Sequence, residues 1–152
     1  MGGSDINNIT HSILENIPNN YSVTVVLGKT SPHNKMLENY VRGKNIKLLI
    51  DSSNMAELML DADLAVGAGG STSWERCCLS LPTFIFLIDE NQRMIVKQLV
   101  KFGSVKLIEN LESIKNNLED IQKNINSWAL MSRKSKSICD GLGAERVRNY
   151  VK

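Results

Sequence analysis

The sequence has few of the residues from which metal centres and self-sufficient catalytic sites are built. Its 152 residues include three cysteines, two histidines, three prolines and only 5% aromatic residues. Cys77 and Cys78 are neighbours and Cys139 is distant, a spacing that fits neither a disulfide framework nor a zinc site. Because only His11 and His33 could assist them, we expect no metal site and no cofactor.

Long apolar runs and an excess of one charge are also missing. Apolar runs such as Leu81–Ile88 are far shorter than the roughly 18 residues of a membrane helix, and no signal peptide opens the chain. The net charge is +2, from 18 Lys and Arg against 16 Asp and Glu spread along the whole chain. We therefore expect a cytoplasmic protein that binds neither nucleic acid nor membranes.

Aliphatic residues are abundant, and their pattern predicts the fold class. Apolar residues make up 42% of the chain, enough for the core of one domain spanning residues 1–152. Short runs of Val, Ile and Leu alternate with longer amphipathic stretches, which is typical of a Rossmann-like, three-layer α/β fold with helices on both faces of a parallel sheet. The predicted strands are 22–27, 46–50, 63–67, 83–88 and 105–108.

Capping signals predict where the helices begin and end. Ser31 before Pro32 predicts an N-cap and a first helical residue, and Gly43 and Gly103 stand where glycines end helices. An amphipathic N-terminal helix is predicted with its apolar face beginning at Ile6. Capping-box spacing occurs in three pairs, which are Asn54 and Glu57, Thr72 and Glu75, and Asp89 and Gln92. Further helices are predicted over 111–126, over 127–139 and after Gly143.

A glycine-rich turn is the strongest local signal of a ligand site. The strand predicted at 63–67 runs into the turn Ala-Gly-Gly-Ser-Thr-Ser, residues 68–73, and then into a helix. Glycines let a ligand approach the backbone closely, and free amides at a helix N-terminus favour an anion such as phosphate. The spacing matches neither the Walker loop nor the G-x-G-x-x-G fingerprint. By itself the turn is equally consistent with an anion site and with an ordinary capped turn.

Further polar residues could surround such a site. The chain opens with a second Gly-Gly-Ser turn at residues 2–4, and turns that follow parallel strands meet at the carboxyl edge of the sheet. Glu75 could accept two hydrogen bonds from a ribose diol, and Asn91 and Gln92 could present amides to a polar ligand. Glu75 and Gln92 also hold capping positions, which explains both without a ligand.

Other candidates favour structural roles. Met55 and Met59 lie four residues apart on a predicted helix and are expected in the core. Cys77 and Cys78 are expected to be buried thiols, because no histidine is placed by the sequence to activate them. No Ser-His-Asp set or carboxylate pair stands out, so we predict no catalytic residue in this chain.

Three stretches together resemble a known enzyme family. They are Asn54–Met59 with Ala62–Pro82, which includes Ser-Trp-Glu-Arg-Cys-Cys, the opening Met-Gly-Gly-Ser-Asp, and Asp140–Val147. With Asn91 and Gln92, they resemble the UDP-2,4-diacetamido-2,4,6-trideoxy-β-L-altropyranose hydrolases of pseudaminic acid biosynthesis, a family that includes spore coat polysaccharide proteins. That family is similar to MurG-type glycosyltransferases of GT-B fold, and this chain resembles the C-terminal, UDP-binding half.

The resemblance implies a role for each candidate residue. The residues implied to contact the nucleotide sugar are Gly3, Ser4, Gly69, Gly70, Ser71, Thr72 and Ser73 at the diphosphate, Glu75 at the ribose, Asn91 and Gln92 at the sugar or phosphate, and Ile50, Asn54 and Met55 at the uracil. The implied reaction is attack of water on the anomeric carbon with UDP leaving, without a metal. Its general base is expected in the N-terminal half, so this chain should bind UDP or a UDP-sugar weakly and hydrolyse it negligibly.

The beginning of the chain departs from the expected fold. In a Rossmann-like half, a central strand precedes the first glycine turn, and here no strand precedes residue 2. Its loss would leave two neighbouring strands with unpaired backbone groups. We expect either that a catalytic N-terminal half or another chain supplies a strand, or that the strand order shifts so that 22–27 pairs with 63–67.

Two other functions remain open at this point. One is a glycosyltransferase half that transfers the sugar to an acceptor other than water, although Ser-Trp-Glu-Arg-Cys-Cys favours the hydrolase. The other is a non-catalytic module that binds nucleotide sugars. The sequence does not identify the sugar, because the residues that select it are shared with the other half.

Overall fold

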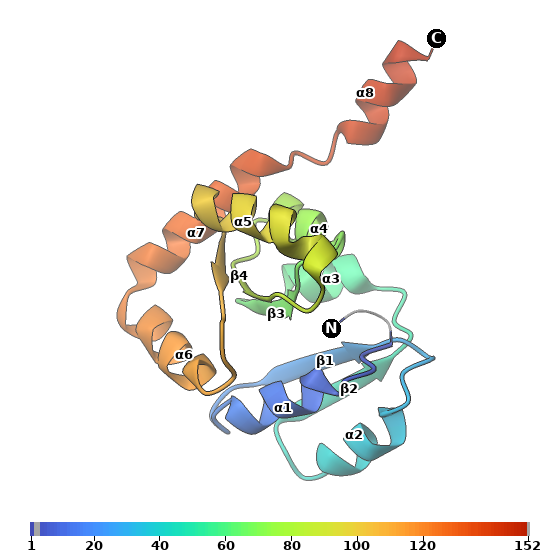
Figure 1. Cartoon of the computed structure of the whole chain (residues 1–152), viewed down its shortest axis with the longest axis vertical. Helices are drawn as coiled ribbons and strands as arrows, with labels where there is room; N and C mark the ends of the chain where they lie inside the picture. The colour runs from blue at the N-terminus through green and yellow to red at the C-terminus, as the bar shows by residue number, and fades with distance from the viewer. Residues whose placement is uncertain (2–3, 152) are drawn as a thin grey trace. The chain divides into compact units, whose positions relative to one another are not determined.

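The protein is an α/β chain that divides into two compact units. The computed structural model describes residues 1 and 4–151 (Figure 1). Unit 1 comprises Met1–Met55 and Ile108–Lys123, and unit 2 comprises Ala56–Leu107 and Asn124–Lys152. Each unit contains its own parallel strands, so the predicted fold class is confirmed.

Unit 1 is built on two parallel strands. β1 (Val23–Leu27) pairs with β2 (Ile46–Ile50) in a register that joins Val23 to Ile46 and Leu27 to Ile50. Alternate residues of β1, Val25 and Leu27, are buried, as expected where one face of a strand covers a core. The helices of unit 1 are α1 (Ile9–Asn16), α2 (Asn34–Tyr40) and α6 (Ser113–Lys123), and the core cluster includes Leu14 and Leu37.

Unit 2 is built on three parallel strands in the order β3-β4-β5. These are β3 (Ala65–Ala68), β4 (Thr83–Phe86) and β5 (Val105–Leu107). Every residue of the central strand β4 is buried, which explains why its sequence is almost continuously apolar. The helices are α4 (Thr72–Cys78), α5 (Arg93–Phe102), α7 (Ile125–Ile138) and α8 (Gly143–Tyr150), with a 3-10 turn, η1 (Glu90–Gln92), before α5. α3 (Met55–Leu60) crosses the boundary between the units in the sequence.

The observed strand pairs test whether the strand order shifts to replace the strand that is expected before residue 2. Among the described residues, β1 is hydrogen-bonded only to β2, and β3 only to β4. The pairing of 22–27 with 63–67 that a shifted strand order requires is not among these pairs. One backbone edge of β1 and one of β3 therefore have no strand partner in the described part of the chain, and supply of a strand from elsewhere stays a prediction.

Two predicted helix starts are wrong. The helix predicted from Pro32 begins at Asn34, because residues 28–34 first form a turn in which the Ser31 hydroxyl accepts a hydrogen bond from the His33 amide at 3.4 Å. The N-terminal helix begins at Ile9, which leaves Ile6 outside it and 73% exposed. Gly103, in contrast, ends α5 in the left-handed conformation, as predicted.

Within the described residues, neither a membrane-spanning helix nor a cluster of metal ligands is present. No helix in residues 1 and 4–151 is both long and apolar enough to cross a membrane. The same residues contain no cluster of three or more His, Cys, Asp or Glu side chains that could hold a metal ion.

Candidate functional site

The glycine loop, defined here as Gly69–Ser73, joins β3 to α4 in unit 2. The Ser73 amide donates to the Gly70 carbonyl, and the Trp74 amide donates to the Ser71 carbonyl, both at 3.0 Å. The helix begins at Thr72, Ser71 holds the cap position, and Ser71 makes no side-chain cap bond. The predicted capping box of Thr72 and Glu75 is therefore wrong by one residue.

The backbone amides of this loop are largely unused. Within residues 1 and 4–151, the N–H groups of Gly70, Ser71 and Thr72 donate to no acceptor. Three consecutive unpaired amides are donors of the kind that bind phosphate oxygens. The exposed hydroxyl of Ser71 and the half-buried hydroxyl of Thr72 add two further potential donors.

Gln92 holds the loop against the start of α5. Its side-chain oxygen accepts a hydrogen bond from the Gly69 amide at 3.1 Å. A Cβ atom on Gly69 would lie 2.2 Å from Cγ2 of Val96 and 3.4 Å from Cβ of Gln92, so only glycine allows this approach. Gln92, predicted as a capping and ligand residue, supports the loop instead of closing a capping box.

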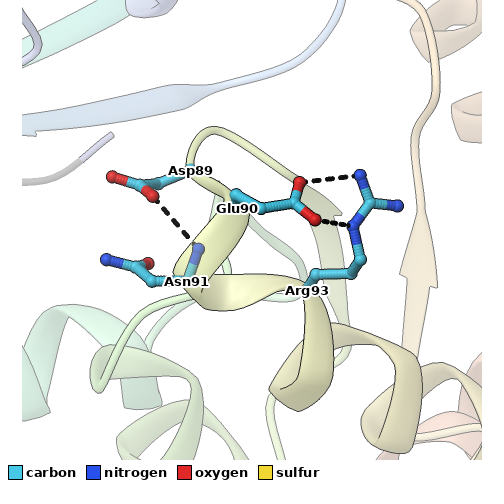
Figure 2. A network of polar contacts seen from close by, with 4 residues as sticks. All are labelled: Asp89, Glu90, Asn91 and Arg93. Atoms are coloured by element: carbon cyan, nitrogen blue, oxygen red, sulfur yellow. Dashed lines mark hydrogen bonds and ion pairs between the residues drawn. The ribbon is translucent and has the colours of Figure 1, made fainter.

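The η1 turn displays Asn91. Asp89 caps it as predicted, because its carboxylate accepts from the Asn91 amide at 3.1 Å. Glu90 accepts from Arg93 at 2.7 Å, and the arginine lowers the pKa of Glu90. Figure 2 shows this ion pair on one side of the turn and the side chains of Asp89 and Asn91 on the other. The Asn91 side chain is exposed, and it lies one residue before the glutamine that contacts the glycine loop.

The residues of α4, the helix that follows the glycine loop, differ in their exposure to solvent. Glu75 is exposed, whereas Ser73 and Arg76 are 1% and 5% exposed. The Ser73 hydroxyl accepts a hydrogen bond from Arg76 at 3.1 Å, so it faces the interior and supports the loop from beneath. Cys77 is also buried, and burial raises the pKa of its thiol, as expected for a structural cysteine.

Sequence reasoning missed Arg76. A signal was present, because Arg76 lies three residues after Ser73 and next to Cys77, on a helix predicted to pack on the sheet, where a charge requires an explanation.

The predicted uracil contacts lie in unit 1, where β2 ends. Ile50 is the last residue of β2 and is 36% exposed, and Leu27, its register partner, is the last residue of β1. Asn54 is exposed and Met55 is half-buried at the start of α3. Ile50 thus lies at the carboxyl end of β2, with Asn54 and Met55 a few residues further on, and their contact with a uracil stays a prediction. Ser4 is exposed, and Gly3 lies outside the described residues.

The N-terminus of α1 is already occupied by a carboxylate of the chain. Asp5 is 4% exposed and accepts from the amides of Ile9 and Thr10, each at 3.0 Å. The amides of Ile9 and Thr10 are therefore not available to an anion, and an anion site at the turn of residues 2–4 stays a prediction. Asp5 caps the helix from outside its first turn, and its negative charge would oppose an anion there.

Removing one acceptor from Asp5 should loosen α1. In an Asp5→Asn variant the amide group can accept at one atom only, so one of the two buried N–H groups loses its partner. We expect unit 1 to lose about 1–2 kcal/mol of stability, seen as faster hydrogen exchange at Ile9 and Thr10. The same change at exposed Asp120 on α6 is the control and should leave these rates unchanged. Unchanged exchange in Asp5→Asn would show that the two bonds contribute nothing.

The fold and the glycine loop define an α/β domain of the GT-B C-terminal class. The structure matches that of MurG from Acinetobacter baumannii with a TM-score of 0.70 and 15% identity, over 97% of this chain and 47% of that one. Residues 1–147 match the glycosyltransferase family 28 C-terminal domain, and the chain belongs to this family.

Several curated proteins are similar to parts of the chain. An uncharacterized protein of Methanocaldococcus jannaschii, MJ1062, is 34% identical over an alignment of 100 residues that covers 61% of this chain and 21% of that protein. The spore coat polysaccharide biosynthesis protein SpsG of Bacillus subtilis is 27% identical over 68% of this chain and 32% of its own. The UDP-2,4-diacetamido-2,4,6-trideoxy-beta-L-altropyranose hydrolase of Campylobacter jejuni is 27% identical over 68% of this chain and 38% of its own. The chain thus corresponds to well under half the length of these relatives.

Proposed function

We propose that this chain binds the UDP part of a nucleotide sugar through the glycine loop. The observation that carries the proposal is the set of three consecutive unpaired amides at Gly70, Ser71 and Thr72, next to a glycine fixed by Gln92. Such amides suit the oxygens of a diphosphate, whose charge strengthens each hydrogen bond. Membership of a family of glycosyltransferase C-terminal domains supports a nucleotide sugar as the source of that diphosphate.

The remaining residues receive roles that suit their exposure. The exposed carboxylate of Glu75 would accept from the two ribose hydroxyls, and the exposed amide of Asn91 would contact the sugar or the phosphate. Gln92 and Ser73 act indirectly by holding the loop. Ile50, Asn54 and Met55 stay the predicted contacts of the uracil.

We further propose that the complete reaction is hydrolysis of a UDP-sugar. Water would attack the anomeric carbon, the bond to the diphosphate oxygen would break, and the loop amides would stabilise the charge that develops on UDP. The resemblance to the Campylobacter jejuni hydrolase supports this reaction, although the chain covers only 38% of that enzyme. We expect the general base outside this chain, so binding should occur without appreciable turnover.

Transfer of the sugar to another acceptor is the second candidate. Membership of a family of glycosyltransferase C-terminal domains supports it. A non-catalytic module that binds nucleotide sugars is the third candidate. Release of free sugar by this chain combined with a complementary N-terminal half would favour the hydrolase, and binding without any turnover in that mixture would favour the module.

Titration calorimetry with UDP tests the proposal. We expect binding in the micromolar to millimolar range, and Glu75→Ala should weaken UDP about tenfold or more by removing hydrogen bonds to a charged group. The same variant should lose less affinity for 2′-deoxy-UDP than for UDP, because one of the two hydroxyl partners is already missing.

The control is Glu112→Ala, which removes an exposed carboxylate in unit 1 and should leave UDP binding unchanged. Failure of the unmodified chain to bind UDP would refute the proposal. Robust hydrolysis by this chain alone would refute the assignment of the general base to another half.

A further inference from the structure

Arg76 bridges the two ends of the glycine loop from beneath. One terminal nitrogen, Nη2, donates to the Ala68 carbonyl at 2.7 Å and to the Ser73 hydroxyl at 3.1 Å. Ala68 is the last residue of β3, and Ser73 lies at the start of α4. The other terminal nitrogen lies 2.0 Å from where a Cβ atom on Gly67 would be, so the guanidinium rests directly on the strand. The loop segment 69–72 is thus held between two anchors of one side chain.

The charge of Arg76 has no ion-pair partner. The side chain is 5% exposed, and within residues 1 and 4–151 no carboxylate lies within salt-bridge distance of it. Its Nε atom is buried and has no hydrogen-bond partner in the same residues. Burial lowers the pKa of the guanidinium, while Cys77 and Glu75 act in the opposite direction. Arginine nevertheless stays protonated at neutral pH, so a buried positive charge lies under the loop.

Stability alone does not explain a buried, unpaired cation. Taking a charge out of water is costly, and a carbonyl and a hydroxyl compensate for only part of that cost. An apolar residue of similar volume is often as stable or more stable at such a position. An anion bound to the amides of Gly70–Thr72 would supply a negative charge to the loop segment whose two ends, Ala68 and Ser73, the guanidinium contacts.

We propose that Arg76 is a positioning residue whose buried charge draws the diphosphate to the glycine loop. This proposal rests on the proposed function, since it assumes that the loop binds the diphosphate of UDP. It goes further by assigning the affinity for phosphate to a side chain that does not touch the ligand. The guanidinium fixes the loop through Ala68 and Ser73, and its charge favours a ligand with more negative charge over one with less.

The test compares three ligands and two variants by titration calorimetry. Arg76→Met removes the charge and keeps the volume, whereas Arg76→Lys keeps the charge and loses the forked geometry. We expect Arg76→Met to bind UDP at least about tenfold more weakly, UMP less affected, and uridine within about twofold of the unmodified chain. Arg76→Lys should bind UDP within about threefold, because its charge remains.

Thermal unfolding separates this role from a purely structural one. If the charge of Arg76 serves ligand binding and not stability, Arg76→Met should unfold at the same temperature as the unmodified chain or at a higher one, while its affinity for UDP falls. Equal losses of UDP affinity in the two variants, or a fall in midpoint that parallels the loss of binding, would overturn the proposal. If Arg76→Met does not fold, Arg76→Gln offers a neutral polar side chain, with the same expected loss of UDP affinity.

Inorganic pyrophosphate distinguishes the two proposals. If the unmodified chain binds pyrophosphate but not UDP, the proposed function fails, and the Arg76 variants can still be compared with pyrophosphate. If it binds UDP and Arg76→Met binds UDP equally well, only the role of Arg76 fails. If it binds neither ligand, both proposals fail.

Discussion

A Gly69→Ala variant should lose at least about a hundredfold in affinity for UDP, because two charge-assisted hydrogen bonds of about 1.5–3 kcal/mol each depend on the position of the loop. The added Cβ atom would lie 2.2 Å from Cγ2 of Val96. Val96 is 3% exposed in the core of unit 2, and its β-branched side chain has little freedom to rotate away. The loop must therefore move, and it loses the bond from the Gly69 amide to Gln92.

Two further variants test the cause of this loss. Gly143→Ala is a matched control, because an added Cβ there meets no atom within 4 Å, and UDP binding should not change. Val96→Ala combined with Gly69→Ala removes the clashing methyl group and should restore at least about tenfold of the lost affinity, a gain of about 1.4 kcal/mol. Calorimetry with UDP measures all of these. Full affinity in Gly69→Ala alone would show that the close approach of the loop to α5 is unimportant.

Phe84→Ala should remove about 3–5 kcal/mol from the stability of unit 2, the cost of truncating a fully buried phenylalanine. Phe84 is 0% exposed on the central strand β4, where its backbone pairs with Val66 of β3 and Lys106 of β5. No neighbouring strand can move inward without breaking this register, so the cavity should persist. A typical domain is stable by only about 5–15 kcal/mol, so much of the stability of unit 2 would be lost.

The matched control is Phe102→Ala at the end of α5, where the side chain is 49% exposed. It should cost less than about 1.5 kcal/mol, because much of its surface is already in water. Urea unfolding followed by tryptophan fluorescence measures both changes. The two tryptophans, Trp74 and Trp128, lie in unit 2, so the signal reports this unit. Similar losses in the two variants would contradict the central position of Phe84.

The strands were predictable because short runs of Val, Ile and Leu are a local signal, strongest in β4, where every residue is buried. All five predicted strands are present, and Ile46–Ile50 has the predicted bounds. Helix starts were predicted less well, because a cap depends on the local turn and not only on residue type. Ser31 and Thr72 both have the side chain of an N-cap, yet the chain turns before the first helix and begins the second at Thr72 itself.

Residue type and spacing predicted the glycine loop at the end of β3, but not the hydrogen bonds that hold it, and its role as a ligand site stays a prediction. The glycine loop, Glu75 and Asn91 were identified from residue type and spacing, and the structure leaves the amides of Gly70–Thr72 unpaired and both side chains exposed. The contact of Gln92 with Gly69 was not predicted, because the two residues lie 23 positions apart in the sequence. No local pattern reports such a distant contact.

The sequence by itself determined the class of the fold and the loop on which a ligand site could form. Apolar runs of strand length and glycines at a strand end are local features, and local physical chemistry is sufficient to interpret them. Only the tertiary structure decided which polar groups remain available to a ligand. Asp5 uses the first amides of α1, Gln92 uses the Gly69 amide, and Arg76 and Ser73 are buried beneath the loop. Hydrogen bonds and burial depend on which groups the folded chain brings together, and residue type alone does not specify that.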